Sequence, residues 1–158
     1  MKFVSFLLKG QPKFGISDGN NITDLTGKIK GAQTLKELIS NKSLQEAKDF
    51  SKKNPGKINH NEIEYLPVIP NPGKIVCVGL NYSEHVKETG RTVEQNPVIF
   101  LRVPESQTAH KQPIQRPKVS ESLDYECEMA VIMGDAGKHI KPENCLLYTS
   151  DAADDFVR

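Results

Sequence analysis

Short apolar runs separated by turn residues make up the first part of the chain. Residues with high β propensity gather at Phe3–Leu8, Phe14–Ile16 and Ile22–Leu25. Between them lie Gly10-Gln-Pro12 and Asp18-Gly-Asn-Asn21, and glycine and asparagine accept the positive φ angles of tight turns. The pattern predicts a β-meander of three strands.

Two capping-box sequences follow the predicted meander. In Thr34-Leu-Lys-Glu37 and Ser43-Leu-Gln-Glu46, the hydroxyl and the carboxylate can satisfy the free N–H groups of a helix start. Apolar residues recur at helical spacing after each of them. We therefore expect two short helices, over residues 35–41 and 44–53.

Residues 54–74 are rich in Pro, Asn and Gly, which favours a domain boundary. Beyond it, continuous apolar runs typical of buried strands alternate with polar stretches. In chain order we expect an extended run at 63–68, a buried strand at 75–78, a helix at 83–89, a strand at 97–103, a polar loop at 104–122 and a strand at 123–133.

Charge and composition exclude several classes of protein. The 158 residues carry 21 Lys and Arg against 20 Asp and Glu, and the net charge is +1. No basic face stands out, so nothing indicates binding to nucleic acid. The apolar run near the N-terminus is too short to span a membrane and lacks a signal cleavage site. We expect a soluble, cytoplasmic protein.

Three cysteines, Cys77, Cys127 and Cys145, show no paired spacing. An odd number of cysteines without a pairing pattern is typical of free thiols in a reducing compartment. Because two of the three lie in apolar runs that resemble strands, we predict that these thiols are buried.

Asp124, Glu126 and Glu128 alternate along the last predicted strand. Alternate residues of a strand share a face, with Cα atoms about 7 Å apart. If the strand is buried, carboxylates this close require a counter-charge, and a divalent cation is the usual one. Oxygen ligands favour Mg²⁺, Mn²⁺ or Ca²⁺ over Zn²⁺. The alternative is a solvated acidic sheet edge.

His85 and Glu88 are three residues apart on the predicted helix, so they share a face. A carboxylate beside an imidazole fixes its tautomer and raises its basicity, which suits a general base. The alternative is an ordinary pair of surface charges. His60, His110 and His139 lack such a setting, and we predict that they are loop residues.

The histidine–glutamate pair and the strand of alternating carboxylates, in this order along the chain, resemble the pattern of a known family. Lys74-Ile-Val-Cys-Val-Gly-Leu-Asn-Tyr-Ser-Glu-His85, Pro97-Val-Ile-Phe-Leu-Arg102 and Leu123-Asp-Tyr-Glu-Cys-Glu-Met129 closely resemble the fumarylacetoacetate hydrolase family. The resemblance implies an α+β, mostly β fold. It implies a small N-terminal domain over 1–66 and part of a mixed-β catalytic domain over 71–144, usually in a homodimer.

The resemblance also implies a metal site and its chemistry. Glu126 and Glu128 would bind Mg²⁺ or Mn²⁺, with Ca²⁺ compatible, and a third Asp ligand would follow about 30 residues later. Asp124 would orient these ligands or bond to backbone. The cation would stabilise the enolate formed from a 2-oxo acid or a 1,3-dicarbonyl compound.

The implied activity is that of a hydrolase or a C–C lyase on such a small molecule. His85, oriented by Glu88, would activate the attacking water, and Arg102 lies where members often have a lysine near the substrate. Decarboxylation, isomerisation and hydration use the same enolate. The alternative is a non-catalytic structural or binding domain with a solvated acidic strand.

The tail departs from the family pattern after about Asn144. Segment 145–158 begins Cys-Leu-Leu-Tyr-Thr-Ser-Asp-Ala-Ala-Asp, which resembles the translation of a transposase sequencing adapter. We interpret it as non-native, and the alternative is a natural, divergent C-terminus. If it is non-native, the third metal ligand is missing, and we expect this polypeptide to be inactive and prone to aggregation.

Overall fold

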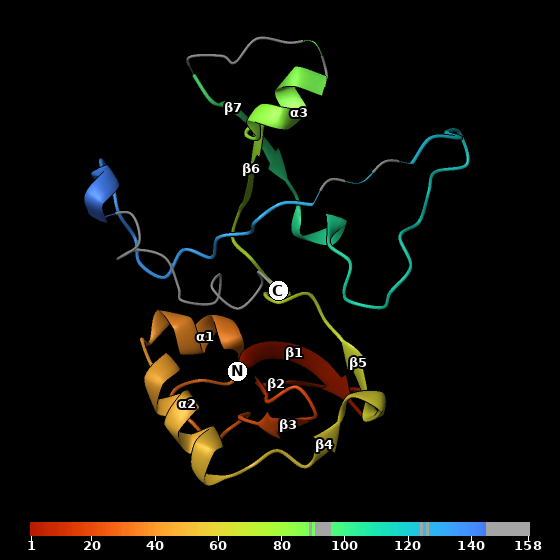
Figure 1. Ribbon diagram of the computed structural model, residues 1–158. Coiled ribbons are helices and arrows are strands. Elements are labelled where there is room, and N and C mark those ends of the chain that lie inside the picture. Colours follow the sequence, from red (N-terminus) through yellow and green to blue (C-terminus); the bar gives the residue numbers. More distant parts are fainter. Residues whose placement is uncertain (89, 91–95, 124, 126, 145–158) are drawn as a thin grey trace. The chain divides into compact units, whose positions relative to one another are not determined.

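The computed structural model of the chain contains a curled five-stranded antiparallel sheet and a separate two-stranded hairpin (Figure 1). The structure describes residues 1–88, 90, 96–123, 125 and 127–144. The chain divides into two compact units. The first unit is Met1–Ile69 with Thr108–Arg158, and the second unit is Pro70–Gln107.

The predicted α+β, mostly β fold class is confirmed, as are the meander and the two helices. In chain order the elements are β1 (Lys2–Leu8), β2 (Gln11–Ser17), β3 (Asn21–Asp24), α1 (Leu35–Ser40), α2 (Leu44–Lys53), β4 (Ile58–Asn59), the 3₁₀ turn η1 (His60–Glu62), β5 (Ile63–Tyr65), β6 (Ile75–Gly79), α3 (Ser83–Glu88), β7 (Val98–Arg102) and the 3₁₀ turn η2 (Pro104–Ser106). No helix within the described ranges is long and apolar enough to cross a membrane.

The large sheet has the strand order β4-β3-β2-β1-β5. The turn between β1 and β2 consists of Lys9 and Gly10, with φ angles of 52° and 76°, because Leu8 pairs with Gln11. Two successive positive φ angles are typical of the turn that matches strand twist. The prediction placed this turn slightly too late, since Pro12 already lies in β2.

The turn between β2 and β3 is the predicted hairpin turn. The Asp18 carboxylate accepts the backbone N–H groups of Asn20 and Asn21, both at 2.8 Å, and Gly19 has a φ of 106°. These backbone hydrogen bonds, from Asn21 and then Asn20, hold the pKa of Asp18 below its ordinary value. The Asp18 side chain therefore accepts hydrogen bonds from backbone N–H groups at the tip of the hairpin.

Only one of the two predicted capping boxes forms. Thr34 accepts from the backbone of Glu37, whose carboxylate accepts from the backbone of Thr34. Ser43 makes no side-chain cap, because its backbone (φ −94°, ψ 18°) is not in the extended conformation that a cap residue needs. Its hydroxyl instead donates to the carbonyl of Asn41.

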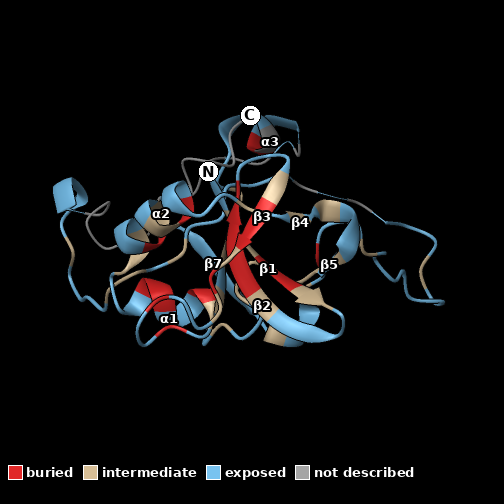
Figure 2. Ribbon diagram, turned by 90° about the horizontal axis from the view of Figure 1, so that it is seen from below, coloured by how far each residue is buried: buried red, intermediate tan, exposed pale blue. Residues whose placement is uncertain are grey.

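One face of the large sheet packs against α1 and α2 (Figure 2). Phe14 and Ile16 of β2 contribute this face and are almost fully buried. The other buried members of the core are Leu25, Ile29, Ala32, Leu35, Leu38, Ile39 and Ala47. Each fully buried Leu, Ile or Phe side chain stabilises the fold by about 1.5–3 kcal/mol.

The opposite face of the sheet is also covered. Phe6 and Ile22 are fully buried there, and Phe6 pairs with Tyr65 of β5. Gly56 passes so close to β3 that an added Cβ would lie 2.4 Å from the carbonyl carbon of Ile22. This segment requires glycine for that reason.

Lys13 of β2 and Asp24 of β3 form an ion pair of 2.6 Å on this second face. Their side chains are 27% and 24% exposed. Burial raises the pKa of Asp24, but the hydrogen bonds from Lys13 and Thr26 lower it by more, and the result lies below the ordinary 3.8. The ionised carboxylate therefore stabilises the folded state.

Replacing Asp24 by asparagine should lower the free energy of unfolding at pH 7 by about 1–3 kcal/mol. The pKa of Asp24 is lower in the folded than in the unfolded chain. The stabilisation by its ionised carboxylate is therefore fully present above pH 3.8 and is lost as the pH falls through the folded pKa. Urea unfolding of both proteins at several pH values should show the two stabilities converging in acid. Asp49→Asn, at an exposed helical pair with Lys52, is the matched control and should change stability much less.

The second unit is more exposed than the sequence predicts. Strands β6 and β7 pair in antiparallel register, with Ile75 opposite Arg102 and Gly79 opposite Val98. Val76 and Leu101 are 55% and 69% exposed, so the strand predicted at 75–78 is present but the prediction that it is buried is wrong. A two-stranded sheet has two faces to cover, and apart from the short turn η2 the one helix among the described residues of this unit is the six-residue α3.

The cysteines were also predicted to be more buried than they are. Cys77 is half-buried in β6 and Cys127 is exposed, and both are free thiols. The strands around Cys77 are themselves partly exposed, and the described residues around Cys127 are exposed. Cys145 lies outside the described residues.

Candidate functional site

Helix α3 carries the predicted histidine–glutamate pair. The chain leaves β6 at Gly79, passes through Leu80 with a φ of 55°, and enters α3 at Ser83. The backbone of His85 and that of Glu88 lie in this helix, three residues apart, so the predicted helical spacing is present. The only strongly buried side chain described in α3 is that of Val86, at 2% exposure.

Arg102 lies at the other end of the hairpin. It ends β7 opposite Ile75, whereas α3 follows the end where Gly79 pairs with Val98. Its guanidinium donates to the hydroxyl of Ser106 at 3.1 Å and to the Ser106 carbonyl at 3.4 Å. In this arrangement the side chain is held by η2.

The acidic segment does not form the predicted strand. Residues 123, 125 and 127–132 have no strand assignment, and Met133 forms only an isolated bridge. Tyr125 and Met129 are 87% and 64% exposed. A strand needs a neighbour that accepts and donates its backbone hydrogen bonds, and no described strand lies beside this segment.

The candidate metal ligands are all carboxylates, whose oxygens fit Mg²⁺ or Mn²⁺ in chemistry. Glu128 is exposed, and Asp124 and Glu126 lie outside the described residues. Across the part of the chain that is described, no three His, Cys, Asp or Glu side chains are grouped so that they could hold a metal ion. The donor set therefore fits the cation, while its geometry stays a prediction.

The six candidate residues divide between the two units. His85, Glu88 and Arg102 belong to the second unit, and Glu128, the described carboxylate of the acidic segment, belongs to the first. Within the second unit the fold places the histidine and the glutamate on one short helix and the arginine at the far end of the hairpin. That the two groups meet at one site is a proposal.

One polar cluster was missed by the sequence prediction. The Nε2 of His60 lies 2.9 Å from the hydroxyl of Ser17, and its Nδ1 lies 2.6 Å from the hydroxyl of Tyr65. His110 meets the Tyr65 ring edge-on, at 4.9 Å between ring centroids. His60 and His110 were predicted to be plain loop residues, and both belong to this cluster.

A local signal for part of this cluster was present. Asn59 and Glu62 form a capping box around His60 in η1, so the turn could have been read from the sequence. The contact of His60 with Ser17 spans 43 residues, and no local pattern encodes it.

Comparison with known proteins gives a consistent result. Residues 74–150 match the family model described as fumarylacetoacetate hydrolase C-terminal, and this range contains all six candidate residues. The mitochondrial oxaloacetate tautomerase fahd2 of Xenopus laevis is 33% identical over 153 residues, covering 92% of this chain and 48% of the relative. The mitochondrial oxaloacetate tautomerase Fahd2a of Rattus norvegicus is 37% identical over 93 residues, or 59% of this chain and 30% of the relative.

A solved structure agrees with the sequence relatives. The fumarylacetoacetate hydrolase from Exiguobacterium antarcticum superposes with a TM-score of 0.75 and 27% identity, covering 94% of this chain and 52% of that one. The chain thus spans about half the length of the proteins that it matches over most of its own length. Sequence motifs, family model and fold agree: the chain belongs to the fumarylacetoacetate hydrolase family.

Proposed function

We propose that this chain supplies part of a divalent-metal site that enolises a small 2-oxo acid. The observation that carries the proposal is the family match over 74–150, which includes both the histidine–glutamate pair and the acidic segment. The relatives named oxaloacetate tautomerases support a 2-oxo dicarboxylic acid as the first substrate to test.

In this proposal Glu126 and Glu128 hold Mg²⁺ or Mn²⁺, and Asp124 orients them. When bound, the cation supplies the positive charge that stabilises negative charge developing on the oxygens of the substrate. Carboxylates also hold the cation without competing for the proton that the reaction moves. In this proposal one set of residues binds the metal and another residue transfers the proton.

His85 moves the proton in this proposal. Its imidazole removes a proton from the carbon next to the keto group, and Glu88 stabilises the imidazolium that results. Return of that proton to the oxygen completes the tautomerisation. Arg102 would bind a substrate carboxylate through two parallel hydrogen bonds, for which it must exchange its present bonds to Ser106.

A second candidate is hydrolysis of a 1,3-dicarbonyl compound, favoured by the solved structure named fumarylacetoacetate hydrolase, with an acylpyruvate as the compound to test. There His85 takes a proton from water, and the hydroxide adds to the carbonyl carbon that is to become an acid. The C–C bond then breaks, its electron pair remains on the pyruvate part as an enolate, and a proton neutralises it. The same residues serve both reactions.

A hybrid protein tests the proposal. It joins residues 1–144 of this chain to the part of the Xenopus laevis relative that lies beyond the match, and the unaltered relative is the positive control. We expect the absorbance of the oxaloacetate enol, or that of an acylpyruvate, to change with turnover in Mg²⁺ or Mn²⁺ and not in EDTA. We also propose that the whole protein is a homodimer, which light scattering on the hybrid measures.

One outcome with the hybrid protein would contradict the proposal. If the folded hybrid turns over neither substrate with either metal while the unaltered relative does, the chain does not supply the site. That outcome would favour the non-catalytic alternative, in which the acidic segment is simply solvated. Circular dichroism and a cooperative unfolding transition establish that the hybrid is folded.

A further inference from the structure

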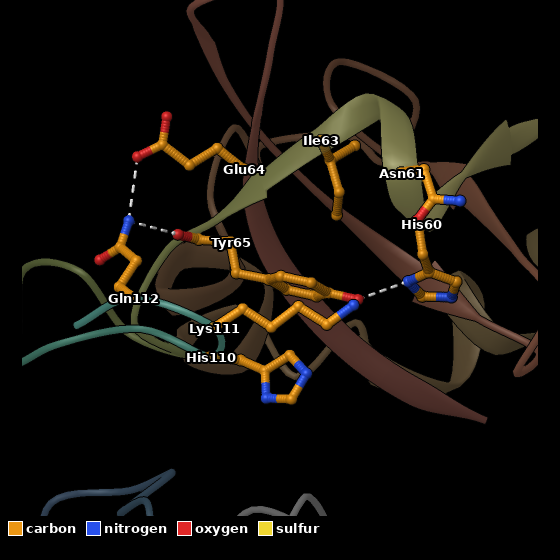
Figure 3. Close-up of a pocket in the computed structure, with 8 residues that line it drawn as sticks. All are labelled: His60, Asn61, Ile63, Glu64, Tyr65, His110, Lys111 and Gln112. Atoms are coloured by element: carbon orange, nitrogen blue, oxygen red, sulfur yellow. Dashed lines mark hydrogen bonds between the residues drawn. The ribbon is translucent and has the colours of Figure 1, made fainter.

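A second polar site lies in the first unit, on the face of the sheet away from α1 and α2. It is a pocket of about 270 Å³ whose lining includes His60, Tyr65, His110 and Lys111 (Figure 3). Tyr65 belongs to this face because it pairs with Phe6 in β1. The described residues that line it include neither Glu88 nor Glu128 of the site proposed above.

The chain presents Lys111 to this pocket at a cost in backbone energy. Ala109 to Gln112 form a turn closed by a 3.0 Å hydrogen bond from the Gln112 N–H to the Ala109 carbonyl. Lys111 occupies the third position with a φ of 64°, where glycine or asparagine is normally found. Lys9 and Lys42 have a similar φ outside this pocket, so the φ of Lys111 belongs to its turn, and the pocket lining is what places its side chain at the site.

Gln112 fixes this turn against β5. Its amide nitrogen donates to Glu64 at 2.9 Å and to the Tyr65 carbonyl at 3.2 Å, and its amide oxygen accepts from the Ala109 N–H. Figure 3 shows these two donated bonds, with Lys111 extended past the Tyr65 ring toward the side of its hydroxyl. The turn therefore holds Lys111 beside the tyrosine.

The hydroxyl of Tyr65 is backed by a hydrogen-bonded relay. Neutral His60 has one donor and one acceptor nitrogen, so the relay runs in one of two directions. If Ser17 donates to Nε2, then Nδ1–H donates to the Tyr65 oxygen and the phenol proton is free to point into the pocket. In the other direction the phenol proton is used on Nδ1.

The charged and hydrogen-bonding side chains of the pocket decide what kind of ligand it can bind. Among the described residues Lys111 makes no ion pair, and the carboxylate of Glu64, which also lines the pocket, accepts from Gln112. An ammonium, a phenol that can donate and the imidazole of His110 thus meet in one pocket. These are the groups that bind a small oxyanion.

We propose that this pocket binds a small carboxylate or phosphate anion between Lys111, His110 and the hydroxyl of Tyr65. A bound anion selects the relay direction in which Ser17 donates to His60 and Tyr65 donates to the ligand. The proposal does not depend on the activity of the metal site, because it uses none of the same residues.

Histidine-ring NMR of the whole chain, titrated separately with inorganic phosphate and with malonate, tests the proposal. We expect at least one anion to shift the ring signals of His60 and His110 saturably in the millimolar range, and His60 to move toward the tautomer with Nδ1–H. Lys111→Met should weaken binding about tenfold, and Tyr65→Phe should weaken it and abolish the tautomer change. The two titrations show whether carboxylate or phosphate is preferred.

Two further variants sharpen the test. Lys118→Met, at an exposed turn outside the pocket, is the matched control and should bind like the wild type. Lys111→Gly should raise the midpoint of thermal unfolding, because glycine relieves the positive φ, and should lose binding. Absence of saturable shifts with both anions, or unchanged binding by Lys111→Met, would overturn the proposal.

Discussion

Replacing Glu126 or Glu128 by glutamine in the hybrid protein should abolish metal-dependent turnover. An amide has nearly the shape of a carboxylate but carries no negative charge, so the change removes a ligand with little effect on packing. Loss of the cation removes several kcal/mol of stabilisation of developing charge, which corresponds to a fall in kcat on the order of 10³. Turnover assays in Mg²⁺ and Mn²⁺ measure this effect.

Direct titration with Mn²⁺, followed by electron paramagnetic resonance, separates binding from catalysis. Each of the two variants should bind the cation at least about tenfold more weakly. Asp135→Asn is the matched control: it removes a carboxylate that pairs with Lys42 at 3.1 Å, and it should leave the affinity for Mn²⁺ unchanged. Wild-type affinity in both glutamine variants would exclude these residues as ligands.

Local patterns predicted the meander and the two helices of residues 1–53 well, because these elements are encoded by neighbours in sequence. Asp18, Gly19 and Asn21 build a turn from their own side chains and φ angles, and Thr34 caps its helix through a residue three positions later. Ser43 shows the limit of such patterns. It has the same spacing as Thr34, but its backbone, with φ −94° and ψ 18°, is not in the capping conformation.

Predictions that depended on distant partners fared worse. Alternation at Asp124 to Met133 is typical of a strand, yet a strand also needs a partner, and the described residues provide none for this segment. Val76 and Leu101 likewise belong to apolar runs that remain exposed in the hairpin. Periodicity shows which side chains share a face and does not show what covers that face.

The candidate site combines both kinds of information. The spacing of His85 and Glu88 is local, and the helix that carries them was predicted. The relay of Ser17, His60 and Tyr65 joins β2 to η1 and β5, and only the fold brings these residues together. Motifs therefore located the proposed catalytic pair, whereas the second pocket required the structure.

His85 provides the sharper test of the proposed chemistry, because its removal should affect the proton and not the metal. In the hybrid protein, His85→Gln should lower kcat by about 10²–10⁴, the usual contribution of a general base, while the affinity for Mn²⁺ stays unchanged. Glu88→Gln should lower kcat less, with little change in KM, because glutamine keeps the position and loses the charge that stabilises the imidazolium. Glu84→Gln is the matched control on the same helix, since Glu84 forms an exposed pair with Lys87 at 2.7 Å, and it should behave like the unaltered hybrid. If His85→Gln retains more than about a tenth of the activity, another group moves the proton, and α3 only supports the site.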